Sequence, residues 1–171
     1  KLSGFSGYLN NPIEVVTGLP QLANWIMDIV LDMRMKQQSI PELLLFNNLN
    51  NIITQTLTSK KIGQLRFGVG PRGLGSTRIQ IVNSETNSQV YPTIFNLSSG
   101  ESSILCLFGE LLRQADNNNN NIMLNAITGI VLIDEVDKHL HIKLQKEVLP
   151  KLFKLFPNVQ FILSSHSPFL S

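Results

Sequence analysis

The sequence has little charge, a single cysteine and no long apolar run, and each feature excludes a class of protein. Charged residues make up 15% of the 171 residues and the net charge is +2, too little to argue for nucleic-acid binding. The single cysteine, Cys106, excludes an intrachain disulfide. No apolar run could span a bilayer, and no secretory signal pattern is found at Lys1. We therefore expect a soluble cytoplasmic protein without membrane partners.

Hydrophobic periodicity predicts two helices followed by an antiparallel meander. Apolar residues recur at helical spacing over 21–38, and a second helix is expected to begin at Pro41. Period-two alternation then indicates short extended pieces at 64–69, 78–82 and 90–94. We expect residues 1–96 to form a helical segment with a small antiparallel β meander.

The C-terminal half carries the pattern of a parallel α/β unit. The elements expected there are a helix at 99–114, an asparagine-rich loop at 116–121, strands at 129–133 and 159–163, and helical structure at 143–156. Pro150 should kink or split that last helix. Two buried-type strands joined through a helix are typical of a βαβ unit, so we expect an α/β fold with a parallel sheet.

The first of these strands ends in two adjacent carboxylates, Asp134 and Glu135. Ligands bind at the carboxyl ends of strands in open α/β sheets, and buried acids need a partner. The Mg²⁺ of a bound nucleotide would supply one, with Asp134 holding the metal and Glu135 facing the attacking water as general base. The alternative interpretation is a strand end capped by two solvated acids.

The segment Leu97-Ser98-Ser99-Gly100-Glu101 opens the helix expected at 99–114. Ser98 and Glu101 stand at capping-box positions. Unpaired backbone N–H groups, together with a glycine that permits close approach, make such a helix N-terminus suitable for binding an anion. An ordinary helix cap would explain the same residues without any ligand.

The second apolar strand is followed by Ser164-Ser165-His166-Ser167. If the two strands are neighbours, His166 lies beside Asp134 and Glu135. Its imidazole could there donate a hydrogen bond to a phosphate oxygen or to a bound water. A lone histidine is equally compatible with a structural role.

Together these motifs resemble the head of an ABC-type ATPase of the RecF-like and OLD-like kind. The matching segments are LSSGE for the signature motif, IVLIDE for the Walker B motif, VDKHLH for the D-loop and SSHS for the His switch. This group includes SMC/Rad50-related repair proteins and ATPases of anti-phage systems such as Septu and retrons. The resemblance covers residues 97–171 and is weak over 1–96. It implies part of a P-loop NTPase sheet.

The resemblance also implies roles for individual residues. Asp134 would coordinate Mg²⁺, Glu135 would be the catalytic carboxylate and His166 would sense the γ-phosphate. The residues that would contact ATP held by the opposite protomer are Ser98, Ser99, Gly100 and Glu101. The D-loop residues expected near the dimer interface are Asp137, His139 and His141. A head-to-head homodimer with two composite ATP sites follows from this assignment.

The sequence has no Gly-x-x-x-x-Gly-Lys-Ser/Thr loop, which the family pattern requires, and its signature carries Ser99 where glycine is usual and Glu101 where glutamine is usual in transporters. Its one glycine cluster consists of Gly68, Gly70, Gly73 and Gly75, and no Gly-Lys-Ser/Thr follows. Without that loop the β- and γ-phosphates lose their main cradle. We therefore expect a fragment whose N-terminal lobe is missing, with no appreciable ATPase activity by itself.

For the full-length protein we expect an ATP-driven switch that serves DNA repair or phage defence, with a nuclease or other effector and DNA as candidate partners. Two alternatives stay open at this point. One is a non-hydrolysing dimerisation or scaffold domain that keeps the ATPase fold. The other is a metal-dependent hydrolase that uses Asp134, Glu135 and Asp137 without a nucleotide.

Overall fold

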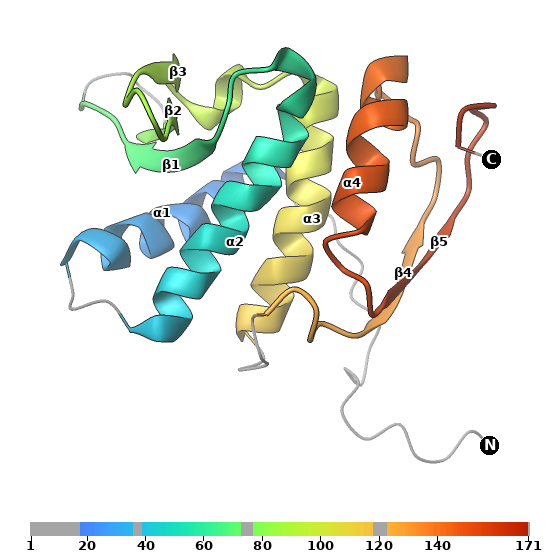
Figure 1. The fold of residues 1–171 in the computed structure, drawn as a ribbon, viewed down its shortest axis with the longest axis horizontal. Coiled ribbons are helices and arrows are strands. Elements are labelled where there is room, and N and C mark those ends of the chain that lie inside the picture. Colours follow the sequence, from blue (N-terminus) through green and yellow to red (C-terminus); the bar gives the residue numbers. More distant parts are fainter. Residues whose placement is uncertain (1–17, 36–38, 73–76, 118–122, 171) are drawn as a thin grey trace, which may run out of the picture.

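The computed structural model describes residues 18–35, 39–72, 77–117 and 123–170. A small meander lies on one side, a layer of helices lies in the middle and a pair of parallel strands lies on the other side (Figure 1). The predicted α/β fold is therefore confirmed. Among the described residues, no helix combines the length and the apolarity needed to cross a bilayer.

The two N-terminal helices form where the apolar stripes predicted them. Helix α1 spans Leu19–Met35 and α2 spans Ile40–Thr56. Residues 36–38 of the first predicted helix lie outside the described residues. The start of α2 is fixed by a capping box, in which the Ser39 backbone N–H donates to the Glu42 carboxylate at 3.0 Å. Proline in the first helical turn completes this start, as predicted.

After a 3₁₀ turn, η1 (Thr58–Lys60), the chain forms the predicted antiparallel meander. Its strands, in the order β1-β2-β3, are β1 (Leu65–Val69), β2 (Ile79–Asn83) and β3 (Gln89–Tyr91). Phe67 and Ile81 face each other in the first pair and are fully buried. Two glycines of the cluster, Gly73 and Gly75, lie outside the described residues.

The extended piece predicted at 90–94 is only partly correct. Strand β3 ends at Tyr91, and Ile94–Asn96 forms a second 3₁₀ turn, η2. The reason is a local cap: the Thr93 side chain accepts a hydrogen bond from the Phe95 N–H at 3.1 Å. Such a cap offers the backbone an alternative to strand pairing.

Helix α3 (Ser99–Asn117) is the central helix of the molecule (Figure 1). It runs three residues past the predicted end because Asp116 has a partner on α1. The indole N–H of Trp25 donates to the Asp116 carboxylate at 2.9 Å. The predicted loop at 116–121 is thus wrong at its first two positions, and residues 118–121 lie outside the described residues.

Strands β4 (Gly129–Ile133) and β5 (Val159–Leu163) pair in parallel, with the bounds that the sequence predicted. The connection between them is a π-helical turn, η3 (Leu144–Val148), followed by α4 (Leu149–Phe153). Pro150 stands at the start of α4, so the predicted split occurs just before it. The four lysines of this connection that the sequence places on its face are all exposed: Lys143, Lys146, Lys151 and Lys154.

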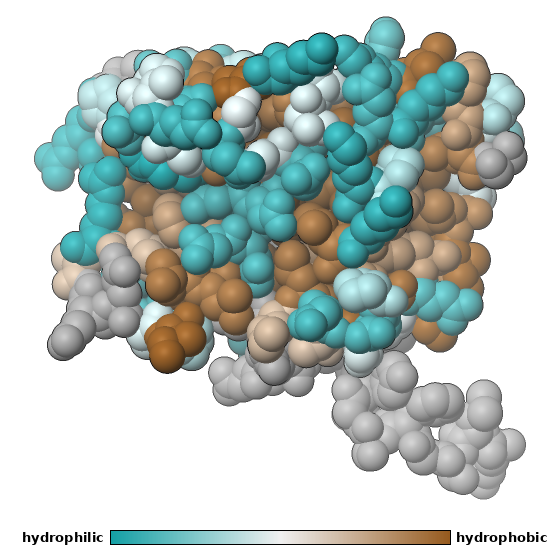
Figure 2. Space-filling model, in the orientation of Figure 1, coloured by the Kyte–Doolittle hydropathy of each residue, from teal (hydrophilic) through white to brown (hydrophobic). Residues whose placement is uncertain are grey.

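The two faces of the parallel pair differ. One face packs on the helices through aromatic rings, since the Phe161 ring centroid on β5 lies 4.6 Å from that of Phe153 on α4 and 6.2 Å from that of Phe108 on α3. The other face leaves Ile130 and Leu132 exposed at 62% and 74%. Figure 2 shows hydrophobic residues over the side of the molecule where β4 and β5 lie. Parallel sheets are normally covered on both faces, so this apolar face is unusual for a stand-alone domain.

Candidate functional site

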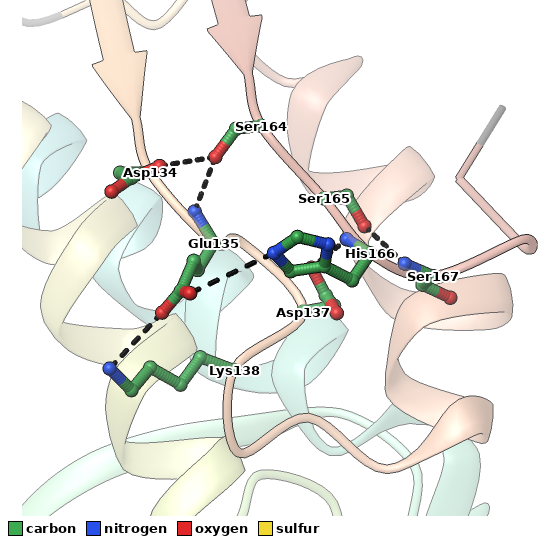
Figure 3. Close-up of polar contacts among 8 residues, drawn as sticks. All are labelled: Asp134, Glu135, Asp137, Lys138, Ser164, Ser165, His166 and Ser167. Carbon is green, nitrogen blue, oxygen red and sulfur yellow. Dashed lines mark hydrogen bonds and ion pairs between the residues drawn. The ribbon is translucent and has the colours of Figure 1, made fainter.

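The polar residues predicted to meet at the ends of β4 and β5 do meet there (Figure 3). The strands are parallel neighbours, so Asp134 and Glu135 after β4 lie beside Ser164 after β5. The Ser164 hydroxyl donates a short hydrogen bond to the Asp134 carboxylate and accepts one of 2.8 Å from the Glu135 backbone N–H. Backbone pairing also continues past the strands, since the Val136 N–H donates to the Ser164 carbonyl at 3.0 Å. One hydroxyl therefore fixes both acids.

The backbone at Glu135 is strained. Its φ is +48°, in the left-handed region that few residues other than glycine adopt. The carboxylate lies 3.1 Å from the Lys138 ammonium and 3.9 Å from the His166 imidazole. Backbone strain at a non-glycine residue concentrates at functional sites, where surrounding contacts maintain it. The turn after β4 thus presents a carboxylate that is held from several directions.

His166 is presented to solvent by a loop that its neighbours hold in place. Its side chain is 87% exposed, so it contributes little to the core. The His166 backbone N–H donates to the Asp137 carboxylate at 3.2 Å. A hydrogen bond from the Ser165 side chain lowers the pKa of Asp137, and the His166 N–H and imidazole add to this effect. An ionised Asp137 therefore joins the segment after β4 to the loop that carries His166.

The donor set around Asp134 fits a magnesium ion that arrives with a nucleotide. Asp134 is exposed, beside a second carboxylate at the end of a strand. Mg²⁺ binds through one or two carboxylates together with waters and substrate phosphates. Among the described residues no group of three or more His, Cys, Asp or Glu side chains could hold a metal ion by itself.

The second predicted half-site is the start of α3. The Ser98 backbone N–H donates to the Glu101 carboxylate at 2.9 Å, and the Glu101 N–H donates to the Ser98 hydroxyl oxygen at 3.3 Å. This reciprocal pair is the predicted capping box. Because the Ser98 oxygen accepts, its hydroxyl hydrogen is available to donate to an anion.

The start of α3 borders a pocket of about 350 Å³ that it shares with the segment after β4. The lining residues are Ser98, Ser99, Gly100, His139, Leu140, His141 and Leu144. A Cβ at Gly100 would lie 2.8 Å from the His139 carbonyl oxygen, so only glycine fits at this contact. His139 itself has a φ of +65°. Neither Asp134 nor Glu135 lines this pocket, so the two predicted groups of residues lie apart in the described chain.

Two lysines that contact predicted site residues were missed in the sequence. Lys138 lies three residues after Glu135, and that spacing could have suggested the ion pair. Lys60 lies 2.6 Å from the Glu101 carboxylate but is separated from it by 41 positions in the chain. No local pattern points to a contact of that kind, because it depends on how α2 packs beside α3.

Comparison with protein families gives one match over most of the chain. The family model described as "AAA domain, putative AbiEii toxin, Type IV TA system" matches residues 37–171.

Among curated proteins the chain is similar to probable ATPases of retrons and to a Septu protein. It is 49% identical over 78 residues to the Retron Vc95 probable ATPase of Vibrio cholerae serotype O1 biovar El Tor, covering 44% of this chain and 15% of that protein. It is 35% identical over 124 residues to the Retron Ec83 probable ATPase of Escherichia coli, covering 71% of this chain and 23% of that protein. The Septu protein PtuA of Bacillus thuringiensis is 27% identical over 133 residues, covering 72% of this chain and 33% of that protein. The chain thus spans a third or less of each relative's length.

Among solved structures, an SMC head domain from Thermotoga maritima matches with a TM-score of 0.48 and 16% identity, covering 86% of this chain and 43% of that one. The fold assignment rests on the family match and the observed topology rather than on this similarity. The family and the curated relatives confirm the resemblance to anti-phage ATPases that the motifs predicted.

Proposed function

Because the chain belongs to this family of AAA domains, we propose that it forms the C-terminal part of an ATP-hydrolysing, ABC-type head in an anti-phage defence protein. Residues 97–171 supply the signature helix, the Walker B strand, the D-loop and the His switch. Residues 1–96 supply the helical segment and the meander of the same head. The phosphate-binding loop comes from a part of the protein that this sequence does not contain.

One observation carries this proposal: the convergence of an acid pair, a serine and a histidine at the ends of two parallel strands. Glu135 lies on strained backbone, Ser164 fixes it through a 2.8 Å hydrogen bond, and His166 lies 3.9 Å from its carboxylate. A stable core needs none of these features, because the His166 side chain is 87% exposed. Strained and exposed polar groups in one place are typical of a reaction site.

The residues act on the terminal phosphate of ATP and on the attacking water. Mg²⁺ bound with the nucleotide would neutralise charge that develops on the phosphate oxygens. Asp134 would hold that ion, with Ser164 orienting the Asp134 carboxylate. The Glu135 carboxylate leaves its ion pair with Lys138, binds the attacking water and accepts a proton from that water. The His166 imidazole donates a hydrogen bond to the γ-phosphate.

A complete site needs two copies of the head. The pocket at the start of α3 is lined by Ser98 and Gly100 but by neither Asp134 nor Glu135. This separation supports a composite site, in which the signature residues of one protomer meet the acids of its partner. ATP would then hold a homodimer closed, and hydrolysis would open it. Asp137 and His139 lie near that interface. An effector such as a nuclease, and DNA, are the proposed partners of the switch.

The test is to compare the full-length protein with its Glu135→Gln variant, by ATP turnover and by size-exclusion chromatography. We expect the variant to lose turnover and to accumulate as an ATP-bound dimer, because it closes but does not hydrolyse. The present chain alone should show no appreciable turnover, because it lacks the phosphate loop. An unsubstituted full-length protein that dimerises with ATP but never hydrolyses ATP would instead favour the scaffold alternative.

A further inference from the structure

Glu101 of the signature motif is a buried acid that is bound by one lysine. Its side chain is 5% exposed, and one carboxylate oxygen lies 2.6 Å from the Lys60 ammonium. The other oxygen accepts the hydrogen bond from the Ser98 backbone N–H. Lys60 also donates a short hydrogen bond to the Tyr91 hydroxyl. Lys60 therefore joins three elements: η1, β3 and the start of α3.

The position of Lys60 is fixed by the turn that carries it. The Lys60 N–H donates to the Leu57 carbonyl at 2.9 Å, within η1. The Lys143 ammonium donates to the Ser59 carbonyl at 3.2 Å, which attaches the same turn to the connection between β4 and β5. In Figure 1, α2 ends and α3 begins at the same end of the molecule, so η1 lies beside the signature motif. The ammonium is thus held by the fold rather than by a flexible loop.

Lys60 is charged in this position. Burial lowers its pKa, but the hydrogen bonds and the negative charge of Glu101, with the Tyr91 contact, outweigh burial and raise it. A charged lysine beside a buried carboxylate gives a neutral pair. Without Lys60 the carboxylate would be a buried and uncompensated charge.

An uncompensated Glu101 would oppose the proposed ligand of this helix end. A helix N-terminus attracts anions through its unpaired N–H groups. A carboxylate in the first turn already uses the Ser98 N–H, and its charge would repel a phosphate brought to Ser98 by a second protomer. Neutralisation by Lys60 removes that repulsion while keeping the capping box that orients the Ser98 hydroxyl.

We propose that Lys60 is a positioning residue of the signature motif, which compensates the charge of Glu101 so that the start of α3 can accept the γ-phosphate of ATP bound to the opposite protomer. This inference rests on the proposed function. It adds a contribution from the N-terminal segment, through η1, to a site that otherwise comes from residues 97–171. Binding of ATP by a protomer's own phosphate loop does not involve Lys60.

The test uses Lys60→Met in the full-length Glu135→Gln protein, because methionine keeps most of the aliphatic side chain and removes the charge. The measurement is the ATP concentration at half-maximal dimerisation, followed by light scattering. We expect Lys60→Met to raise this ATP concentration by about tenfold or more, as for loss of one partner of a buried charge pair. Binding of a fluorescent ATP analogue to the monomer should stay unchanged. Lys61→Met, at the exposed neighbouring position, is the matched control.

Two further variants separate charge compensation from a loss of folding. Lys60→Arg keeps the charge and should recover most of the dimerisation lost in Lys60→Met. Adding Glu101→Gln to Lys60→Met removes the uncompensated carboxylate, so the double variant should dimerise better than Lys60→Met alone. If Lys60 acted independently of Glu101, the two substitutions would instead give additive losses of dimerisation.

Each outcome decides the inference. Equal dimerisation of Lys60→Met and Lys61→Met would overturn it, and so would a double variant no better than the single one. Both results would leave the proposed ATPase switch intact, since the Glu135→Gln parent would still close with ATP. A parent that fails to dimerise with ATP would overturn the proposed function and this inference together.

Discussion

The backbone N–H of Glu135 donates a 2.8 Å hydrogen bond to the hydroxyl of Ser164. This bond joins the ends of β4 and β5, which pair in parallel although η3 and α4 lie between them in the chain. The same hydroxyl donates to Asp134. Ser164 therefore sets the distance between the acid pair and the loop that carries His166. It also helps to hold Glu135 at its φ of +48°.

Replacing Ser164 tests whether this positioning matters for the reaction. In the full-length protein, Ser164→Ala should lower kcat by about tenfold or more, because a misplaced catalytic group loses rate steeply. The free energy of unfolding should fall by only about 1 kcal/mol, the usual net value of a hydrogen bond. Ser164→Thr keeps the hydroxyl and is the matched control. Equal kcat for the alanine and threonine variants would show that the hydroxyl does not position the acids.

Replacing Gly100 tests the contact between the start of α3 and the segment after β4. A Cβ there would lie 2.8 Å from the His139 carbonyl oxygen and 2.9 Å from a Leu144 methyl group. Gly100→Ala should therefore lower the free energy of unfolding by about 1–3 kcal/mol, the usual effect of overpacking. It should also weaken ATP-dependent dimerisation.

Gly68→Ala is the matched control for Gly100→Ala, because its Cβ would meet its neighbours at an ordinary 3.5 Å. Both variants can be compared by thermal melting and by dimerisation in the Glu135→Gln background. If Gly100→Ala melts and dimerises like Gly68→Ala, the segment after β4 does not restrain the start of α3.

Cys106 supplies a test that depends on pH. Burial, and to a smaller extent the charge of Glu110, raise the pKa of this thiol from 9.0 to about 11. A raised pKa in the folded state stabilises the fold fully below pH 9, and this contribution is lost as the pH rises towards 11. The native thiolate is therefore scarce at pH 8, and alkylation should be slow.

The measurement is the rate of iodoacetamide labelling at the Cys106 peptide, followed by mass spectrometry between pH 7 and 11. The rate should keep rising up to about pH 11. Denatured protein is the control and should level off near pH 9. A native profile that also levels off near pH 9 would show that α3 does not bury this thiol.

The sequence predicted the parts of the fold that depend on local patterns. The bounds of β4 and β5, the capping box of Ser98 and Glu101, and the split before Pro150 all follow from short-range rules. The meander was predicted except at η2, where the Thr93 cap competes with the strand. Alternation alone does not reveal that competition.

The features that were not predicted depend on tertiary structure. The extra turn of α3 follows from the Trp25–Asp116 hydrogen bond, and the Lys60–Glu101 ion pair follows from the packing of α2 beside α3. The π-helical geometry of η3 likewise has no simple sequence signature. In the site, the convergence of the acids with His166 was conditional on the two strands being neighbours, a pairing that only the structure establishes.

The central claim is that each ATP is shared by the acids of one head and the signature residues of another. The most direct test mixes two inactive full-length variants, Glu135→Gln and Ser98→Arg, and measures ATP turnover. In a mixed dimer one site combines the intact Glu135 of one protomer with the intact Ser98 of its partner, so the mixture should regain part of the lost turnover. If each variant is inactive alone and the mixture regains nothing, the shared site is contradicted.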